Sequence, residues 1–148
     1  MELTTIQSIT GQFCDVLRSK LAADGTNATS KLSKSIKGIV KYDGKYLTVS
    51  LRLEEYYKFV ENGTSPHFPP LDAIKKWIKV KPVLPRPLKS GKLPTTNQLA
   101  YLIGRKISKV GTKAKPFLSP TLTSFDFVQK VYNEVLNLIT KELENEVE

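Results

Sequence analysis

Apolar residues in the first part of the chain recur at the spacing of an amphipathic helix. They are Leu3, Ile6, Ile9, Phe13, Val16, Leu17 and Leu21. Positions that repeat every three or four residues share one face of a helix, so this pattern predicts a helix of about five turns that ends at Gly25. The polar stretch from Thr26 to Ser35 predicts a loop.

A β-hairpin is predicted next, over about residues 35–53. Ser35 to Tyr42 and Tyr46 to Leu53 are rich in Ile, Val, Tyr and Leu, and the second stretch alternates apolar with polar residues. Alternation predicts a strand with one buried and one solvated face. Asp43-Gly44 between the stretches predicts a two-residue turn in which both residues have positive φ.

Short helices are predicted in the middle of the chain. Glu54 to Glu61 predicts one that Asn62-Gly63 ends. A second contains Leu71 and Trp77 and ends before Pro82. The segment at about 79–94 is rich in Pro and Lys and predicts a long loop.

Two further helices are predicted toward the C-terminus. Thr95 and Gln98 have the spacing of a capping box, and they begin a helix that ends at Gly111. We expect its inner face to carry Leu99, Leu102, Ile103 and Ile107. The last helix is predicted to start near Pro120 and to continue almost to the C-terminus.

These elements together predict an α+β fold. A small antiparallel sheet built on the hairpin is expected to be packed by the long N-terminal and C-terminal helices, with short helices between. The chain has 148 residues and shows no internal repeat. We therefore expect residues 1–148 to form a single domain.

Positive charge is concentrated in the middle of the chain. The chain has 23 Lys and Arg against 14 Asp and Glu, for a net charge of +9. Residues 31–115 alone carry +14, whereas residues 116–148 carry −4. Such a block favours a polyanion as neighbour, most simply nucleic acid. A solvated surface, or pairing with the acidic end of another copy, would produce the same pattern.

No catalytic or metal-binding cluster is evident in the sequence. His67 is the only histidine and Cys14 the only cysteine, which is too few ligands for a zinc site. Cys14 lies on the apolar face of the first helix, where a thiolate is disfavoured. We expect no enzyme activity, no cofactor and no metal. Because a single cysteine allows no internal disulfide, we expect a protein of a reducing compartment. We also expect no secretory signal and no membrane span, and therefore no membrane partner.

Three stretches of sequence occur in an order that resembles a known family. They are residues 29–36 (T-S-K-L-S-K-S-I), 56–64 (Y-Y-K-F-V-E-N-G-T) and 111–118 (G-T-K-A-K-P-F-L). The order resembles the tail-completion and head–tail joining proteins of tailed bacteriophages, the gene-product-ten-like family of lambdoid phages. Ser30 and Lys58 stand where that family often has Gly and Ala.

The resemblance implies a structural protein of the virion. Its copies would form a homo-oligomeric ring at the head–tail junction, assembled in the cytoplasm of the bacterial host, through which DNA passes. Neighbouring neck, portal or tail-tube proteins would be its partners, together with weak, non-specific contact with phage DNA.

The candidate residues fall into two groups. The motif residues are expected to be architectural and are Tyr57, Val60, Glu61, Gly63, Thr64, Gly111, Thr112, Pro116, Phe117 and Leu118. Candidates for contacts in the channel or between subunits are Lys75, Lys76, Lys79, Lys81, Arg86, Lys89 and Lys92. The alternative function is that of a small nucleic-acid-binding regulatory protein of a phage, which the basic middle favours. No helix–turn–helix spacing supports that alternative.

Overall fold

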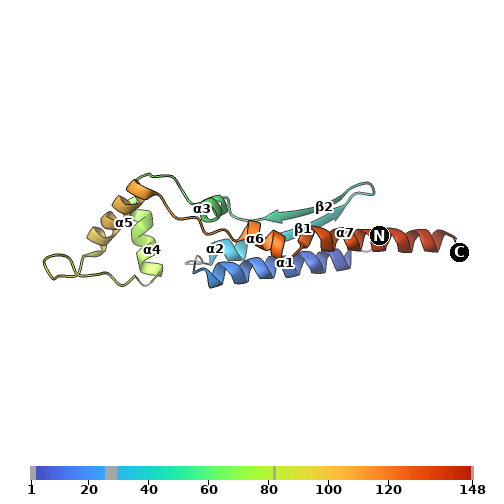
Figure 1. The fold of residues 1–148 in the computed structure, drawn as a ribbon, viewed down its shortest axis with the longest axis horizontal. Coiled ribbons are helices and arrows are strands. Elements are labelled where there is room, and N and C mark those ends of the chain that lie inside the picture. Colours follow the sequence, from blue (N-terminus) through green and yellow to red (C-terminus); the bar gives the residue numbers. More distant parts are fainter. Residues whose placement is uncertain (1–2, 26–29, 82, 148) are drawn as a thin grey trace. The chain divides into compact units, whose positions relative to one another are not determined.

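The computed structural model describes residues 3–25, 30–81 and 83–147. The chain divides into two compact units (Figure 1). Unit 1 comprises residues 1–57 and 116–148, and unit 2 comprises residues 58–115. The α+β class is confirmed, because long helices flank a two-stranded antiparallel sheet. That residues 1–148 act as a single domain stays a prediction.

The first long helix supplies most of the core of unit 1. Helix α1 (Thr4–Ala23) follows the predicted range closely. Its buried residues are Ile6, Thr10, Phe13, Cys14, Leu17 and Leu21. The hydroxyl of the buried Thr10 donates to the carbonyl of Ile6 at 2.8 Å, so this polar group is satisfied inside the helix.

Helix α2 (Lys31–Ser35) corrects the predicted loop at 26–35. Residues 26–29 of that prediction lie outside the described residues. The side chain of Leu32 is buried, which stabilises this short helix although its neighbours are polar. Arg18 of α1 donates a hydrogen bond to the carbonyl of Ile36, just after α2, at 2.6 Å.

The hairpin consists of β1 (Lys37–Tyr42) and β2 (Leu47–Arg52), with Tyr42 paired to Leu47. The predicted turn is therefore displaced by one residue. The N–H of Asp43 donates to the carbonyl of Tyr46 at 3.3 Å, and only Gly44 in this turn has positive φ. The carboxylate of Asp43 accepts the N–H groups of Lys45 and Tyr46, at 2.9 and 2.7 Å, and so keeps Asp43 at the first corner.

One face of the hairpin lies against α1. A side chain at Gly38 would collide with Thr10 and would press on the sulfur of Cys14, so the missing Cβ lets β1 approach the helix closely. On β2 the apolar residues Leu47, Val49 and Leu51 are half-buried, and the residues between them are exposed. The predicted alternation is thus confirmed.

The predicted single C-terminal helix is wrong, because the chain breaks at Asp126. Helix α6 (Leu118–Ser124) is followed by α7 (Phe127–Val147), and Asp126 between them has a φ of 54°. Asp tolerates this left-handed conformation better than most residues. The break allows both flanking rings to pack on Phe13, with centroids at 5.6 Å for Phe125 and 4.5 Å for Phe127. Helix α7 packs against α1 and runs in the opposite direction (Figure 1).

Unit 2 is built on a pair of helices. Helix α3 (Tyr57–Asn62) leads into it; it begins three residues later and ends one residue later than predicted. Helix α4 (Leu71–Val80) packs on α5 (Thr96–Val110). The predicted capping box is confirmed: Thr95 Oγ1 accepts the N–H of Gln98, and the Gln98 side chain accepts the N–H of Thr95. Between α4 and α5 the described residues form no helix or strand. They include one turn, which is closed by a hydrogen bond from the Leu88 N–H to the Lys92 carbonyl at 2.8 Å.

Small residues set the contact between α4 and α5. Ala100 and Gly104 are the buried residues of α5, and a Cβ at Gly104 would lie 3.1 Å from the ring of Phe68 and 3.4 Å from Ile74. Leu102 was predicted to face inward, but it is 42% exposed. The inward position predicted for Leu102 is wrong, because α5 faces α4 with the side that carries its smallest residues, Ala100 and Gly104.

Candidate interaction surfaces

Two parts of the predicted motif meet in unit 2. Gly63-Thr64 and Gly111-Thr112 lie side by side and form what we term the Gly-Thr bridge. The N–H of Thr64 donates to the carbonyl of Thr112 at 3.1 Å, and the reverse hydrogen bond measures 3.2 Å. The two hydroxyls are 2.8 Å apart, and Thr64 Oγ1 also accepts the Thr112 N–H at 3.1 Å. The bridge thus joins segments 48 residues apart.

Glycine is required at both corners of the bridge. Gly63 has a φ of +71° and Gly111 a φ of +70°, a region that other residues adopt only at a cost. A side chain at Gly63 would collide with the Thr112 carbonyl, and one at Gly111 with the Thr64 carbonyl. The absence of both Cβ atoms lets the backbones approach closely enough to bond.

The remaining motif residues are spread over both units. In unit 2, Val60 is half-buried and its carbonyl accepts the N–H of Lys115 at 2.8 Å, while Glu61 is buried. In unit 1, Phe117 is completely buried just before α6. Tyr57 and Leu118 are half-buried and Pro116 is exposed. The expected architectural role fits the buried residues best.

The predicted basic contacts all lie on α4 and the loop that follows it. Lys76, Lys79, Arg86, Lys89 and Lys92 are exposed. Lys75 lies 3.7 Å from the carboxylate of Asp72 on the same helix. Lys81 is half-buried, with its Nζ 5.8 Å from the centroid of the Trp77 ring.

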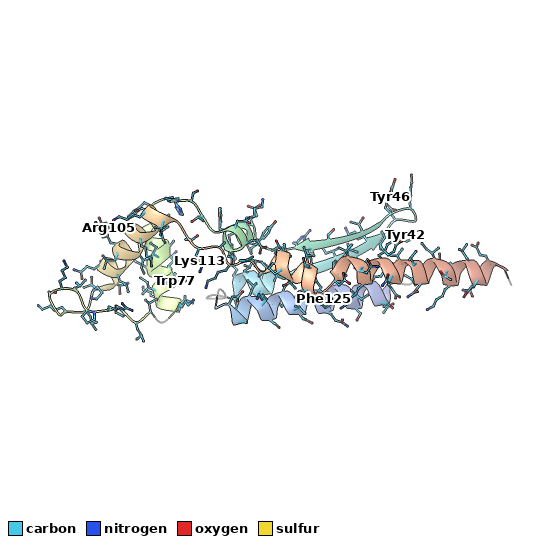
Figure 2. The ribbon with its side chains drawn as sticks, viewed as in Figure 1. Tyr42, Tyr46, Trp77, Arg105, Lys113 and Phe125 are labelled. Atoms are coloured by element: carbon cyan, nitrogen blue, oxygen red, sulfur yellow. The ribbon has the colours of Figure 1, made fainter. Side chains whose placement is uncertain are left out.

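A second group of cations was missed by the sequence analysis. Arg105, Lys106 and Lys109 lie on the exposed side of α5, and Lys113 follows that helix. Figure 2 shows the long side chains of Arg105 and Lys113 in unit 2, which also contains Trp77. The polar side of a predicted amphipathic helix carried this information, because residues 105 and 109 are one helical turn apart.

The division into units separates the charges sharply. Residues 58–115 contain 13 Lys and Arg but only Glu61 and Asp72 as acids, so unit 2 has a net charge of +11. The remaining residues contain 10 Lys and Arg against 12 acids, so unit 1 has a net charge of −2. Of the two acids in unit 2, Glu61 is buried and Asp72 is near Lys75, so the exposed surface is strongly positive.

Unit 1 contains an open groove between α1 and β1 that includes Cys14, Arg18 and Gly38. Burial raises the pKa of the Cys14 thiol above its ordinary value of 9.0, and this effect exceeds the opposing effect of the nearby Arg18. Cys14 is therefore a protonated, apolar core residue at neutral pH. Within residues 3–25, 30–81 and 83–147, no group of three or more His, Cys, Asp or Glu side chains is placed to hold a metal ion.

None of the described helices is both long enough and apolar enough to cross a membrane. Comparisons of the chain with protein-family models, with curated proteins and with solved structures give no match. The resemblance to phage joining proteins therefore depends on the three sequence motifs and their order.

Proposed function

We propose that this chain is a non-enzymatic structural protein of a tailed bacteriophage. Its copies form a ring at the head–tail junction, between the portal and the tail tube, and DNA passes through the ring. The protein assembles in the host cytoplasm and acts in the virion.

The Gly-Thr bridge is the observation that carries this proposal. Its two halves belong to the second and third motifs of the family resemblance, which are far apart in sequence. Short strings that match by chance have no physical reason to pair with each other. Their pairing in unit 2, with glycine required at both corners, supports reading the two motifs as parts of one inherited structure.

The first motif and the frame of the fold add support. The segment at 29–36 contains α2 and the buried Ile36 and leads directly into β1. The third motif ends with the buried Phe117 and with Leu118, the residue at which α6 begins. Each motif thus lies at a junction between elements, where a family needs to fix the path of its chain.

The test is to locate the protein in isolated phage particles. Imaging of the neck region at a resolution that resolves helices should show a closed ring into which unit 1 and unit 2 fit. A particle that assembles fully without the protein, with all copies free in the infected cell, would exclude the joint.

A second candidate is the small nucleic-acid-binding regulator, which the +11 charge of unit 2 favours. A regulator requires preference for a base sequence, so competition between DNA duplexes of different sequence separates the two candidates. The joint predicts equal displacement by all duplexes.

A further inference from the structure

Helix α7 carries, from Tyr132 onward, an apolar stripe that unit 1 leaves largely uncovered. We call residues 132–147 the C-terminal arm. Figure 1 shows it extending past the N-terminal end of α1 and the tip of the hairpin. The exposed fractions along the stripe are 56% for Tyr132, 45% for Leu136, 42% for Ile139 and 58% for Leu143.

The spacing of this stripe is that of a packing seam. The four residues are separated by four, three and four positions, which places them in one row along the helix. Soluble proteins rarely expose a continuous apolar row without a partner for it. The arm therefore has the form of a helix that packs against another surface.

The arm is also acidic. It contains Glu134, Glu142, Glu144 and Glu146 against Lys141, for a net charge of −3. The acids near the end of the arm, from residue 142 onward, are exposed beside the stripe. A partner for the arm must therefore combine apolar contact with positive charge.

The outer face of α5 in unit 2 has this combination. Tyr101, Leu102 and Val110 are 52%, 42% and 66% exposed. Arg105, Lys106 and Lys109 lie between them, also exposed. These residues form two neighbouring rows, 101–105–109 and 102–106–110, and within each row successive residues are about one helical turn apart, so together they make a continuous face. Helix α5 has 15 residues, close to the length of the arm.

We infer that the C-terminal arm of one copy docks on the outer face of α5 of a neighbouring copy. This inference rests on the proposed ring and names the surfaces that hold it together. If two copies met through the same surface, either two units 2, each with a net charge of +11, or two acidic arms would face each other, and like charges repel. A head-to-tail contact pairs opposite charges, and such contacts generate a ring when the rotation closes.

A charge exchange between two full-length variants tests the contact. The arm variant carries Glu142→Lys, Glu144→Lys and Glu146→Lys, and the α5 variant carries Arg105→Glu, Lys106→Glu and Lys109→Glu. Lys and Glu are both good helix formers, so the helices should be retained, which far-UV circular dichroism checks. Sedimentation velocity over a range of concentrations and of salt then measures assembly.

Each variant alone should need at least about tenfold more protein than the wild type for half-assembly, because its arm meets a like charge. An equimolar mixture should recover assembly, since each reversed surface then finds its complement on the other variant. Wild-type assembly should weaken as salt is raised. An α5 variant that assembles like the wild type, or a mixture that does not recover, overturns the inference.

The apolar stripe has its own test. Leu136→Ala, Ile139→Ala and Leu143→Ala together should also raise the concentration for half-assembly at least about tenfold. The control Asn137→Ala with Asn145→Ala changes polar positions of the same arm and should leave assembly unchanged. Equal effects in both variants would contradict docking through the stripe.

Other outcomes separate this inference from the proposed function. A wild-type protein that stays monomeric at all concentrations overturns the contact between copies. If the α5 variant loses binding to a DNA duplex while its assembly is unchanged, the face of α5 serves nucleic acid instead. A ring seen in particles without the arm at its subunit contacts would refute the inference and leave the joint intact.

Discussion

Substitution of Gly111 by alanine should unfold much of unit 2. Gly111 has a φ of 70° and a ψ of −162°, a combination that only glycine adopts easily. Forcing alanine into it costs about 1–3 kcal/mol. The new Cβ also collides with the Thr64 carbonyl, so the two backbone hydrogen bonds of the Gly-Thr bridge must lengthen or break.

The size of the effect follows from these two contributions. Each lost hydrogen bond removes about 1 kcal/mol, so the total loss is about 3–5 kcal/mol. Within the described part of unit 2, Ile74 and Ala100 are the buried apolar side chains, so the core is small. A loss of this size is a large fraction of the stability that so small a core provides.

Trp77 makes the measurement local. It lies in α4 and is 39% exposed, so its fluorescence should report the unfolding of unit 2 in urea. Gly91→Ala is the matched control, since Gly91 also has positive φ (+76°) but no atom within 4 Å of the added Cβ. The control should lose about 1 kcal/mol. If Gly111→Ala shifts the transition no further than Gly91→Ala, the proposed collision is refuted.

Three further predictions concern single residues. Thr64→Val should lower the stability of unit 2 by about 1–2 kcal/mol, because the hydroxyl that accepts the Thr112 N–H is lost. Thr64→Ser keeps the hydroxyl and should keep the stability. Urea unfolding followed by Trp77 fluorescence compares the two variants, and equal losses of stability would contradict a role for the hydroxyl. Phe13→Ala should lower the free energy of unfolding by about 3–5 kcal/mol, because it removes a buried ring that packs on two others. Urea unfolding followed by far-UV circular dichroism measures this loss. The control Phe59→Ala, at a residue that is 62% exposed, should change the free energy by no more than about 0.5 kcal/mol, and a comparable loss there would argue against the packing. The raised pKa of Cys14 means that folding favours the protonated thiol, so this contribution to stability is complete below pH 9.0 and is lost as the pH rises above it. A thiol reagent at neutral pH should react quickly only after denaturant is added, and rapid reaction with the native protein would contradict the burial.

Local signals were sufficient to predict many elements. Thr95 and Gln98 define a helix start because the residues that cap it lie within one turn of each other. The alternation on β2 likewise depends only on neighbouring residues. Predictions of this kind succeed because they depend only on residues that are close together in the sequence.

Tertiary contacts decided the elements that were predicted wrongly. The pattern of apolar residues predicts one helix through Asp126, but the chain breaks there and the rings on both sides of the break pack on Phe13. Leu102 fits an apolar stripe as well as its neighbours, yet Gly104 allows a closer approach and determines which side faces α4. Such choices depend on the surface opposite, which periodicity does not describe.

The candidate surfaces also depend on contacts between residues that are far apart in the sequence. Gly63 and Gly111 were recognised separately as residues that end helices, but their pairing joins positions 48 residues apart. The positive charge of the middle segment was evident, whereas its restriction to unit 2 depends on where the units divide. Sequence therefore located the residues, and the fold determined which of them act together.

The division of the chain also affects the order in which the protein forms during synthesis. Unit 2 is one continuous segment, so it is complete once residue 115 has left the ribosome. Unit 1 is interrupted, and the rings of Phe125 and Phe127 that pack on Phe13 are made last. Nascent chains generally fold unit by unit from the N-terminus. Here the inserted middle segment can close first, while α1 and the hairpin, although made earlier, wait for the end of the chain.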